Sequence, residues 1–167
     1  MTQSSSPALS PSLLEAADLS PEAARSILSG AMTGADDGEL FLERAETESL
    51  VFDDGRLKAA SYDAHEGFGL RVVSDETAGY AHSSVVDAAA IARAAETASL
   101  ATQGRTGVQA EAPVSTNQQL YAPIDPLASP AFSDKIALLS EIDAWARTRD
   151  PRVVQVSVSM AGEHRDI

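Results

Sequence analysis

The most informative stretch of the sequence, residues 49–82, reads S-L-V-F-D-D-G-R-L-K-A-A-S-Y-D-A-H-E-G-F-G-L-R-V-V-S-D-E-T-A-G-Y-A-H. The segment Asp53–Arg56 predicts a tight hairpin turn, because an Asp-Gly pair tolerates the positive φ angles of such turns. Ser74–Thr77 predicts a second turn, and alternating apolar residues flank both turns. Strands that follow one another through short turns predict an antiparallel β-meander.

Four strands are expected in this region, at residues 38–52, 57–64, 67–73 and 78–82. The polar middle of the first strand, Arg44–Ser49, indicates either a long edge strand or a break. In the second strand the apolar face changes after Ala59, which indicates a β-bulge. We expect five large apolar residues to face a covering helix: Leu40, Leu42, Phe68, Leu70 and Val72.

Helices are expected on both sides of the meander. A short helix fits residues 11–18, and Ser20 is the expected N-cap of a helix that starts at Pro21 and ends at Gly30 or Gly34. After the meander, an alanine-rich helix is expected to run from a cap at Ser83 or Ser84 to about Thr102, because its small side chains allow close approach to a sheet.

The C-terminal part of the sequence predicts one helix and one strand. The helix is expected to begin at a Ser133 cap and to end before Asp150-Pro151. Its expected core stripe is Leu138, Leu139, Ile142, Trp145 and Ala146. Val153–Met160 then predicts a strongly apolar strand, whose edge we expect to seek a partner, most simply a second copy of the chain.

Together these patterns predict an α+β fold. An antiparallel β-meander is packed by helices and is followed by a helix and a terminal strand, as a fragment of a larger fold. Four consecutive regions are expected: 1–19, a mostly disordered tail with a possible short helix; 20–103, the helix, meander and alanine-rich helix; 104–131, a long connector; and 132–167, a helix and strand that lead into a C-terminal catalytic domain outside this sequence.

Composition limits the function classes. The 167 residues carry a formal net charge of −13 with 44% hydrophobic residues, which argues against unaided binding to nucleic acid or anionic membranes and against a disordered polyanion. The sequence contains no cysteine, so disulfides, thiolate metal sites and cysteine nucleophiles are excluded. The first dozen residues carry no export signal, and a cytoplasmic location is expected.

Residues with catalytic potential are few. His65, in an expected turn, and the separate His82 and His164 have no partner at the spacing of a helical metal site. The segment Gly67-Phe68-Gly69 lacks the third glycine and the following helix of a dinucleotide loop, so strand glycines are the better interpretation. Glu46 and Glu48 share one strand face and could serve as paired carboxylates, although a solvated face is the better interpretation.

The stretch Ser49–His82 resembles the N-terminal domain of the TldD/PmbA family, whose members were historically named modulators of DNA gyrase. The segment Leu120–Leu127 (L-Y-A-P-I-D-P-L), the helix before Asp150–Val153 and the strand after it extend the resemblance to about residues 38–160. Tyr121 with Asp125-Pro126-Leu127 favours the TldD branch over its PmbA (TldE) paralogue. The order and spacing of these segments together carry the resemblance.

The resemblance implies a zinc metalloprotease that cleaves unfolded peptides or peptide precursors and that pairs with a PmbA (TldE)-like paralogue. The family's H-E-x-x-x-H motif lies downstream of the matching region, and this sequence contains no match to it. No catalytic, cofactor-binding or metal-binding residue is therefore assigned here. We expect no cofactor in this chain, zinc in the C-terminal domain of the parent protein, and an inactive chain that helps to form the substrate chamber and the dimer.

Two alternatives stay open. The chain could be part of a PmbA (TldE)-like, non-catalytic partner subunit. It could also be a stand-alone module that binds a peptide or a partner through a strand edge. In each case the expected partners are a PmbA (TldE)-like paralogue, a second copy or an unfolded peptide, with no direct contact to nucleic acid or membrane.

Overall fold

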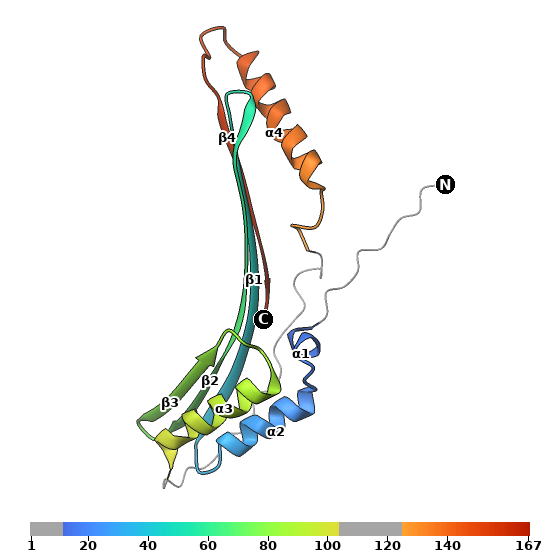
Figure 1. Cartoon of the computed structure of the whole chain (residues 1–167). Helices are drawn as coiled ribbons and strands as arrows, with labels where there is room; N and C mark the ends of the chain where they lie inside the picture. Colours follow the sequence, from blue (N-terminus) through green and yellow to red (C-terminus); the bar gives the residue numbers. More distant parts are fainter. Residues whose placement is uncertain (1–11, 104–124) are drawn as a thin grey trace, which may run out of the picture. The chain divides into compact units, whose positions relative to one another are not determined.

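The computed structural model describes residues 12–103 and 125–167, so the expected features of residues 1–11 and of the connector up to residue 124 lie outside the described residues. Two helices precede a meander of three strands (Figure 1). The elements are α1 (Leu13–Ala16), α2 (Pro21–Ala31), β1 (Asp37–Asp53), β2 (Arg56–Ser74), β3 (Thr77–Ser83), α3 (Ala88–Ser99), the 3₁₀ turn η1 (Leu100–Thr102), α4 (Phe132–Arg147) and β4 (Ser157–Asp166). The predicted α+β class is confirmed.

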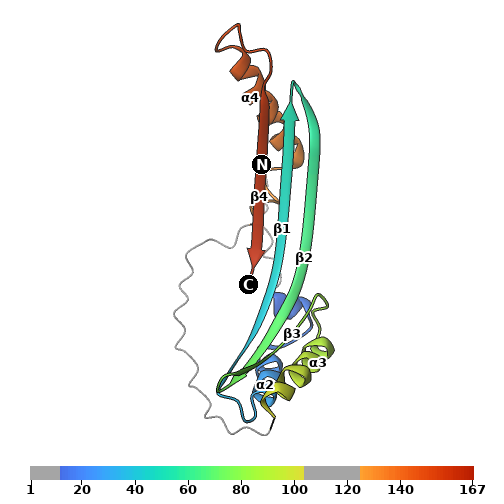
Figure 2. The ribbon, with the colours of Figure 1, turned by 90° about the vertical axis from the view of Figure 1, so that its left-hand side faces the viewer.

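The strands form one sheet in the order β3-β2-β1-β4, and β4 runs opposite to its neighbour β1 (Figure 2). Both predicted turns are confirmed. Asp54 and Gly55 have φ angles of 50° and 78° in the β1–β2 hairpin, and Asp75 has a φ of 52° between β2 and β3. β2 and β3 are antiparallel, with Phe68 opposite Ser83 and Ser74 opposite Thr77.

Two predictions about the strands are wrong. The polar middle of β1 is neither a break nor an edge, because β1 is continuous and lies between β2 and β4. The expected turn at His65-Glu66 is also absent, since residues 56–74 form the single strand β2. Polar residues are accommodated here because side chains on neighbouring strands form hydrogen bonds with one another. Arg44 of β1 donates two hydrogen bonds to Glu66 Oε2 of β2, at 3.2 and 3.0 Å.

The residues of β2 that face the cores change from odd-numbered to even-numbered along the strand. In β1 the large apolar residues that belong to the core clusters are even-numbered: Leu40, Leu42, Leu50 and Phe52. In β2, Leu57 is odd-numbered, whereas Phe68, Leu70 and Val72 are even-numbered. An extra residue between Leu57 and Phe68 would produce this change, which supports the predicted bulge.

The contacts divide the chain into two units. Unit 1 comprises Met1–Arg44, His65–Pro123 and Asp166–Ile167, and unit 2 comprises Ala45–Ala64 and Ile124–Arg165. This division differs from the four consecutive regions expected from the sequence, because the long strands β1 and β2 each contribute residues to both units.

Unit 1 contains an apolar core between the sheet and the helices α2 and α3. Phe68, Leu70 and Val72 are buried in it with Ile91 of α3, and Leu40 and Leu42 pack against it, as predicted. The close approach of α3 depends on Gly79, where a Cβ atom would lie 1.9 Å from the carbonyl oxygen of Ala98.

Local side-chain hydrogen bonds cap the first turns of α2 and α3. Ser20 caps α2 as predicted, since its Oγ accepts from the Ala23 N–H at 3.1 Å. The cap of α3 is Asp87 instead of Ser83 or Ser84, and its carboxylate accepts from the Ala90 N–H at 2.6 Å. Ser83 Oγ instead accepts from the Val85 N–H at 2.9 Å, in the turn that precedes the helix.

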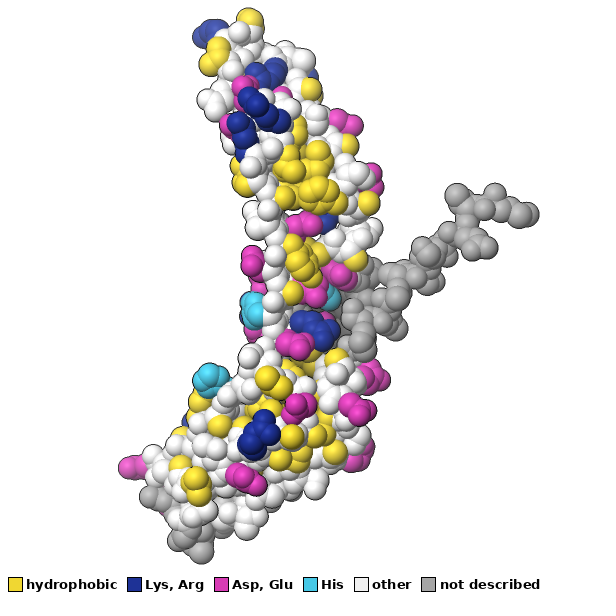
Figure 3. Space-filling model, in the orientation of Figure 1, with side chains coloured by type: hydrophobic (Ala, Val, Ile, Leu, Met, Phe, Trp, Pro, Cys, Tyr) yellow, Lys and Arg dark blue, Asp and Glu magenta, His cyan; other side chains and the backbone are white. Residues whose placement is uncertain are grey.

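Unit 2 contains a smaller core, in which α4 lies along the sheet (Figure 1). Leu50, Phe52 and Leu139 are buried there. Three residues of the predicted stripe of α4 are wrong: Trp145 is 59% exposed, and Leu138 and Ile142 are also exposed. Leu139 is buried as predicted, and Ala146 is half-buried. Figure 3 accordingly shows hydrophobic side chains gathered on the surface of this helix region.

The buried face of α4 consists of Lys135, Leu139 and Asp143, spaced four residues apart. Ion pairs explain this orientation. Lys135 Nζ donates to Glu48 Oε1 at 2.6 Å, and the guanidinium of Arg147 donates to both Asp143 and Asp54. Donation to these two carboxylates raises the pKa of Arg147. The expected Ser133 cap is also wrong, since the helix begins after Ala131 without a side-chain cap.

The last strand begins later than predicted. β4 spans Ser157–Asp166 instead of Val153–Met160, and one of its edges pairs with β1. Val154 is 84% exposed before the strand, whereas Val158 and Met160 pack on the core of unit 2. Among residues 12–103 and 125–167, the helices are all too short or too polar to cross a membrane.

Candidate functional site

The polar middle of β1 supplies the acidic residues of the candidate site, which lies in unit 2. Glu46 and Glu48 follow the same alternation as the core residues Leu50 and Phe52. Both side chains are half-buried, so this face is solvated only in part. Glu48 is held by Lys135, whose side chain is only 4% exposed.

The segment that leads into α4 lies against these strands. Lys135 Nζ donates to the carbonyl oxygen of Leu127 at 2.8 Å, and Leu127 N–H donates to Asp125 Oδ1 at 2.7 Å. On the side of β4, a Cβ atom at Gly162 would lie 2.7 Å from Leu127 Cδ2. The missing side chain of Gly162 therefore makes room for Leu127 and brings Asp125 close to the strand.

Three residues from three segments converge at this point: Glu46 of β1, Asp125 before α4 and His164 of β4. One carboxylate or imidazole ligand atom from each lies within 4.8 Å of the others, and all three side chains are half-buried. His164 Nδ1 lies 3.7 Å from Asp125 Oδ1. Two carboxylates and one imidazole form a donor set that can bind a metal ion or transfer a proton.

Tyr62 of β2 adjoins this group of residues. Desolvation, the charge of Glu46, a hydrogen bond with Glu46 and the charge of Asp125 together raise the pKa of Tyr62. The Tyr62 side chain, which is 58% exposed, therefore lies near the two carboxylates of this group.

The other two histidines lie in unit 1. His65 is in the middle of β2, where its Nε2 lies 4.0 Å from Glu43 Oε1. His82 lies on β3, with its ring centroid 5.7 Å from that of Tyr80. Both histidines line a shallow hollow with Gly67 and Gly69, which are strand glycines as predicted.

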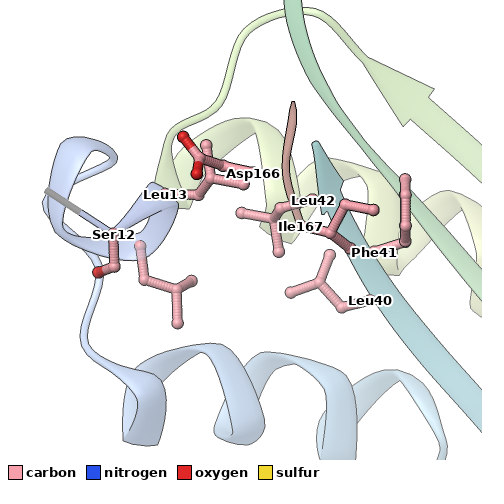
Figure 4. A pocket seen from close by; sticks show the side chains of 8 residues that line it. Ser12, Leu13, Leu40, Phe41, Leu42, Asp166 and Ile167 are labelled. Carbon is pink, nitrogen blue, oxygen red and sulfur yellow. The ribbon is translucent and has the colours of Figure 1, made fainter. Parts of the chain in front are cut away.

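A second hollow in unit 1, of about 450 Å³, is mainly apolar (Figure 4). Leucines of α1 and β1 face one another across it, and Ile167 reaches it from the end of the chain. Its lining offers Ser12 and Asp166 as polar side chains. This composition suits the packing of apolar groups better than chemistry.

Sequence reasoning assigned no metal-binding residue and missed the convergence of Glu46, Asp125 and His164. The expected last strand ended at Met160, which left His164 outside any element. A strand extended to Asp166 would have placed His164 on the same face as Val158 and Met160. No local spacing could have found Asp125, because its position depends on tertiary packing.

Comparison with known protein families adds the decisive observation. Residues 38–102, which span the meander and α3, match the family described as PmbA/TldA metallopeptidase domain 1. The chain contains domain 1 of the PmbA/TldD family. The matched range contains Glu46 and Tyr62, whereas Asp125 and His164 lie outside it.

Curated relatives in the PmbA/TldD family extend the similarity beyond domain 1. The Metalloprotease TldD homolog of Haemophilus influenzae is 32% identical over 136 residues, which are 79% of this chain and 28% of the relative. The Metalloprotease TldD homolog of Buchnera aphidicola subsp. Schizaphis graminum is 29% identical over 133 residues, with the same coverage. The chain thus spans less than a third of the length of these relatives.

Solved structures of PmbA/TldD-type proteins share the fold. TldE from Thermococcus kodakarensis matches with a TM-score of 0.60 and 16% identity, over 86% of this chain and 34% of that chain. A candidate modulator of DNA gyrase from Bacteroides thetaiotaomicron matches with a TM-score of 0.56 and 16% identity, with the same coverage. At this identity the similarity concerns the fold alone.

Proposed function

We propose that this chain is the N-terminal, non-catalytic part of a TldD-type zinc metalloprotease that cleaves unfolded peptides or peptide precursors. One observation carries the proposal. Two relatives named as TldD metalloproteases match 79% of this chain, yet the chain spans only 28% of each of them. In such a protein the catalytic residues would lie in the part that this sequence does not cover.

The histidines of the chain do not fit the catalytic zinc that the family implies. The sequence has three histidines, and none belongs to an H-E-x-x-x-H motif. His65 and His82 lie in unit 1, whereas His164 lies in unit 2. No step of peptide hydrolysis is therefore assigned to residues of this chain.

The strand edges support a role in assembly. Among the described residues, β3 pairs only with Phe68–Ser74, and the preceding part of β2 is exposed from Lys58 to Glu66. β4 is the other outer strand of the sheet. Unpaired edges accept further strands, so we propose that they contact the remainder of the protease, its PmbA (TldE)-like partner or a second copy, and thereby help to form the substrate chamber.

The test is cleavage of an unstructured fluorogenic peptide by two proteins. One is this 167-residue chain, and the other is a longer product of the same gene that extends into an H-E-x-x-x-H motif. We expect the longer protein to cleave the peptide, a chelator to abolish this cleavage, and the short chain to be inactive. Chelator-sensitive cleavage by the short chain alone would contradict the proposal.

A second candidate is a PmbA (TldE)-like, non-catalytic subunit, which is compatible with the fold shared with TldE from Thermococcus kodakarensis. A gene that continues past Ile167 without an H-E-x-x-x-H motif would support this candidate. A stand-alone binding module would instead require a gene that ends near Ile167.

Light scattering at several concentrations tests self-association, for which we expect a dimer at high concentration.

A further inference from the structure

We propose that Glu46, Asp125 and His164 bind one divalent transition-metal ion in unit 2. The inference rests on side chains of this chain and does not depend on the proposed peptidase function. It concerns a structural ion and assigns no catalytic step to it.

The distances leave room for an ion between the ligand atoms. The three candidate ligand atoms lie within 4.8 Å of one another, and His164 Nδ1 is 3.7 Å from Asp125 Oδ1. A separation of 3.7 Å is too long for a hydrogen bond. Tetrahedral zinc with ligands at about 2.0–2.2 Å holds its ligand atoms roughly 3.3–3.6 Å apart. Small side-chain rotations would therefore complete the coordination.

Two of the ligands are held in place by neighbouring groups. Asp125 Oδ1 accepts the Leu127 N–H at 2.7 Å, and the Leu127 carbonyl is held by Lys135 at 2.8 Å. Glu46 is carried by β1, which lies between β2 and β4, so its backbone position is fixed by the sheet. Such outer contacts orient the ligands of metal sites and strengthen binding. Because the site is largely preformed, the cost in conformational entropy of binding an ion is small.

The donor set indicates the class of ion. An imidazole nitrogen suits zinc and its neighbours in the transition series, whereas magnesium and calcium prefer sites made of oxygen atoms. Three protein ligands leave at least one position for water. With a neutral imidazole, the two carboxylates match the charge of a divalent ion.

The proposed ion would link the segment that contains Asp125 to the sheet. Glu46 and His164 belong to β1 and β4, whereas Asp125 belongs to the segment before α4. An ion bound to all three would fasten that segment to the sheet within unit 2, where the apolar cluster has three buried members among the described residues. Binding would therefore stabilise unit 2 in proportion to the free ion concentration.

The experiment is a zinc titration of the purified full chain, followed by calorimetry and by amide NMR spectra. We expect one zinc ion per chain and chemical-shift changes centred on Glu46, Asp125 and His164. Magnesium at the same concentration should produce no such changes. No zinc binding, or shift changes centred elsewhere, would overturn the proposal.

Conservative uncharged variants test the ligands one by one. Glu46→Gln, Asp125→Asn and His164→Gln should each weaken zinc binding at least tenfold. The matched controls are Glu163→Gln, a carboxylate next to His164 that pairs with Arg165, and His65→Gln, an exposed histidine of unit 1. Both controls should bind as the unmodified chain does.

Two results would overturn the assignment: unchanged affinity in the three ligand variants, or an equal loss in His65→Gln. Amide spectra of the metal-free variants show whether each remains folded, and only folded variants are compared. If one variant unfolds, the remaining two decide the outcome. Zinc binding without peptide cleavage leaves the proposed function intact, so the two proposals fail separately.

Discussion

Unit 1 and unit 2 share two long strands but are held together differently. Among the described residues, unit 1 buries a cluster of twelve core residues under α2 and α3, whereas the cluster in unit 2 has only Leu50, Phe52 and Leu139. Unit 2 instead buries charged groups, Lys135 and Asp143, on the inner face of α4. The comparison teaches that apolar packing can stabilise one unit while paired charges help to stabilise another.

The largest expected effect comes from removing core volume in each unit. Leu70→Ala in unit 1 and Leu139→Ala in unit 2 should each lower the free energy of unfolding by about 2–5 kcal/mol, because both leucines are fully buried. Urea unfolding measures the loss in the free energy of unfolding of the whole chain. Hydrogen exchange should show faster opening of α4 and β4 in Leu139→Ala, with β3 and α3 still protected.

For Leu70, a loss below about 0.5 kcal/mol would mean that this face of β2 is not the core. For Leu139, equal loss of protection in both units would mean that they unfold as one. The comparison between the units would then have no energetic basis.

Removal of the buried ammonium group of Lys135 should have the next largest effect. Lys135→Met leaves Glu48 half-buried without its partner at 2.6 Å. We expect a loss of about 2–4 kcal/mol, toward the lower end for broken buried pairs because Glu48 keeps some contact with water. Replacing both residues by Met should recover most of the loss, as measured by urea unfolding.

Lys58→Met is the matched control, since Lys58 is an exposed lysine in the same unit. It should change the free energy of unfolding by less than about 0.5 kcal/mol. If Lys135→Met and Lys58→Met behave alike, buried charge does not stabilise unit 2.

Two glycine substitutions should have effects of opposite sign. Gly55→Ala in the β1–β2 hairpin should cost about 1–2 kcal/mol, because a φ of 78° is strained for a residue with a Cβ atom. Gly30→Ala in the last turn of α2 should stabilise unit 1 by about 0.5 kcal/mol, because a helical φ suits alanine and the added Cβ meets no atom within 4 Å. Thermal unfolding measures both, and a gain at Gly55 would contradict the turn geometry.

The smallest expected effect is a pH dependence at Asp150. Hydrogen bonds from the Arg152 side chain and N–H lower the pKa of Asp150 below its ordinary value of 3.8. Because the folded-state pKa is lowered, the ionised Asp150 carboxylate contributes its full stabilisation above the unfolded-state pKa. This stabilisation is lost as the pH falls through the folded-state pKa. Asp150→Asn should therefore be slightly less stable than the unmodified chain at pH 7, and this difference should shrink as the pH falls below 3.8 and vanish only below the lowered folded-state pKa.

Local features of the fold could be predicted from the sequence, and long-range ones could not. The hairpin at Asp54-Gly55 and the Ser20 cap depend on a few adjacent residues, so both predictions are confirmed. The length of β2 was missed because His65-Glu66 looks like a turn. The strand continues because β2 pairs with β1, and Glu66 accepts hydrogen bonds there from Arg44 on that neighbouring strand.

Helix α4 shows the limit of hydrophobic patterning. Its apolar spacing predicted a core stripe that includes Trp145, yet the helix presents Lys135 and Asp143 to the sheet. Partners on β1 and in the hairpin, Glu48 and Asp54, decide this rotation through Lys135 and Arg147. The same long-range dependence hid the candidate site, because Asp125 and His164 meet only after α4 and β4 have packed on β1.

The burial of Lys135 has a practical consequence for chemical labelling. The sequence contains two lysines, Lys58 and Lys135, and both lie in unit 2. Lys58 is exposed, whereas Lys135 is shielded by the sheet and by Glu48. An amine-reactive reagent should therefore modify Lys58 at once and Lys135 only when unit 2 opens. Mass spectrometry measures both labelling rates. The ratio of the Lys135 rate to the Lys58 rate reports how often unit 2 opens, and Lys58 serves as the internal reference.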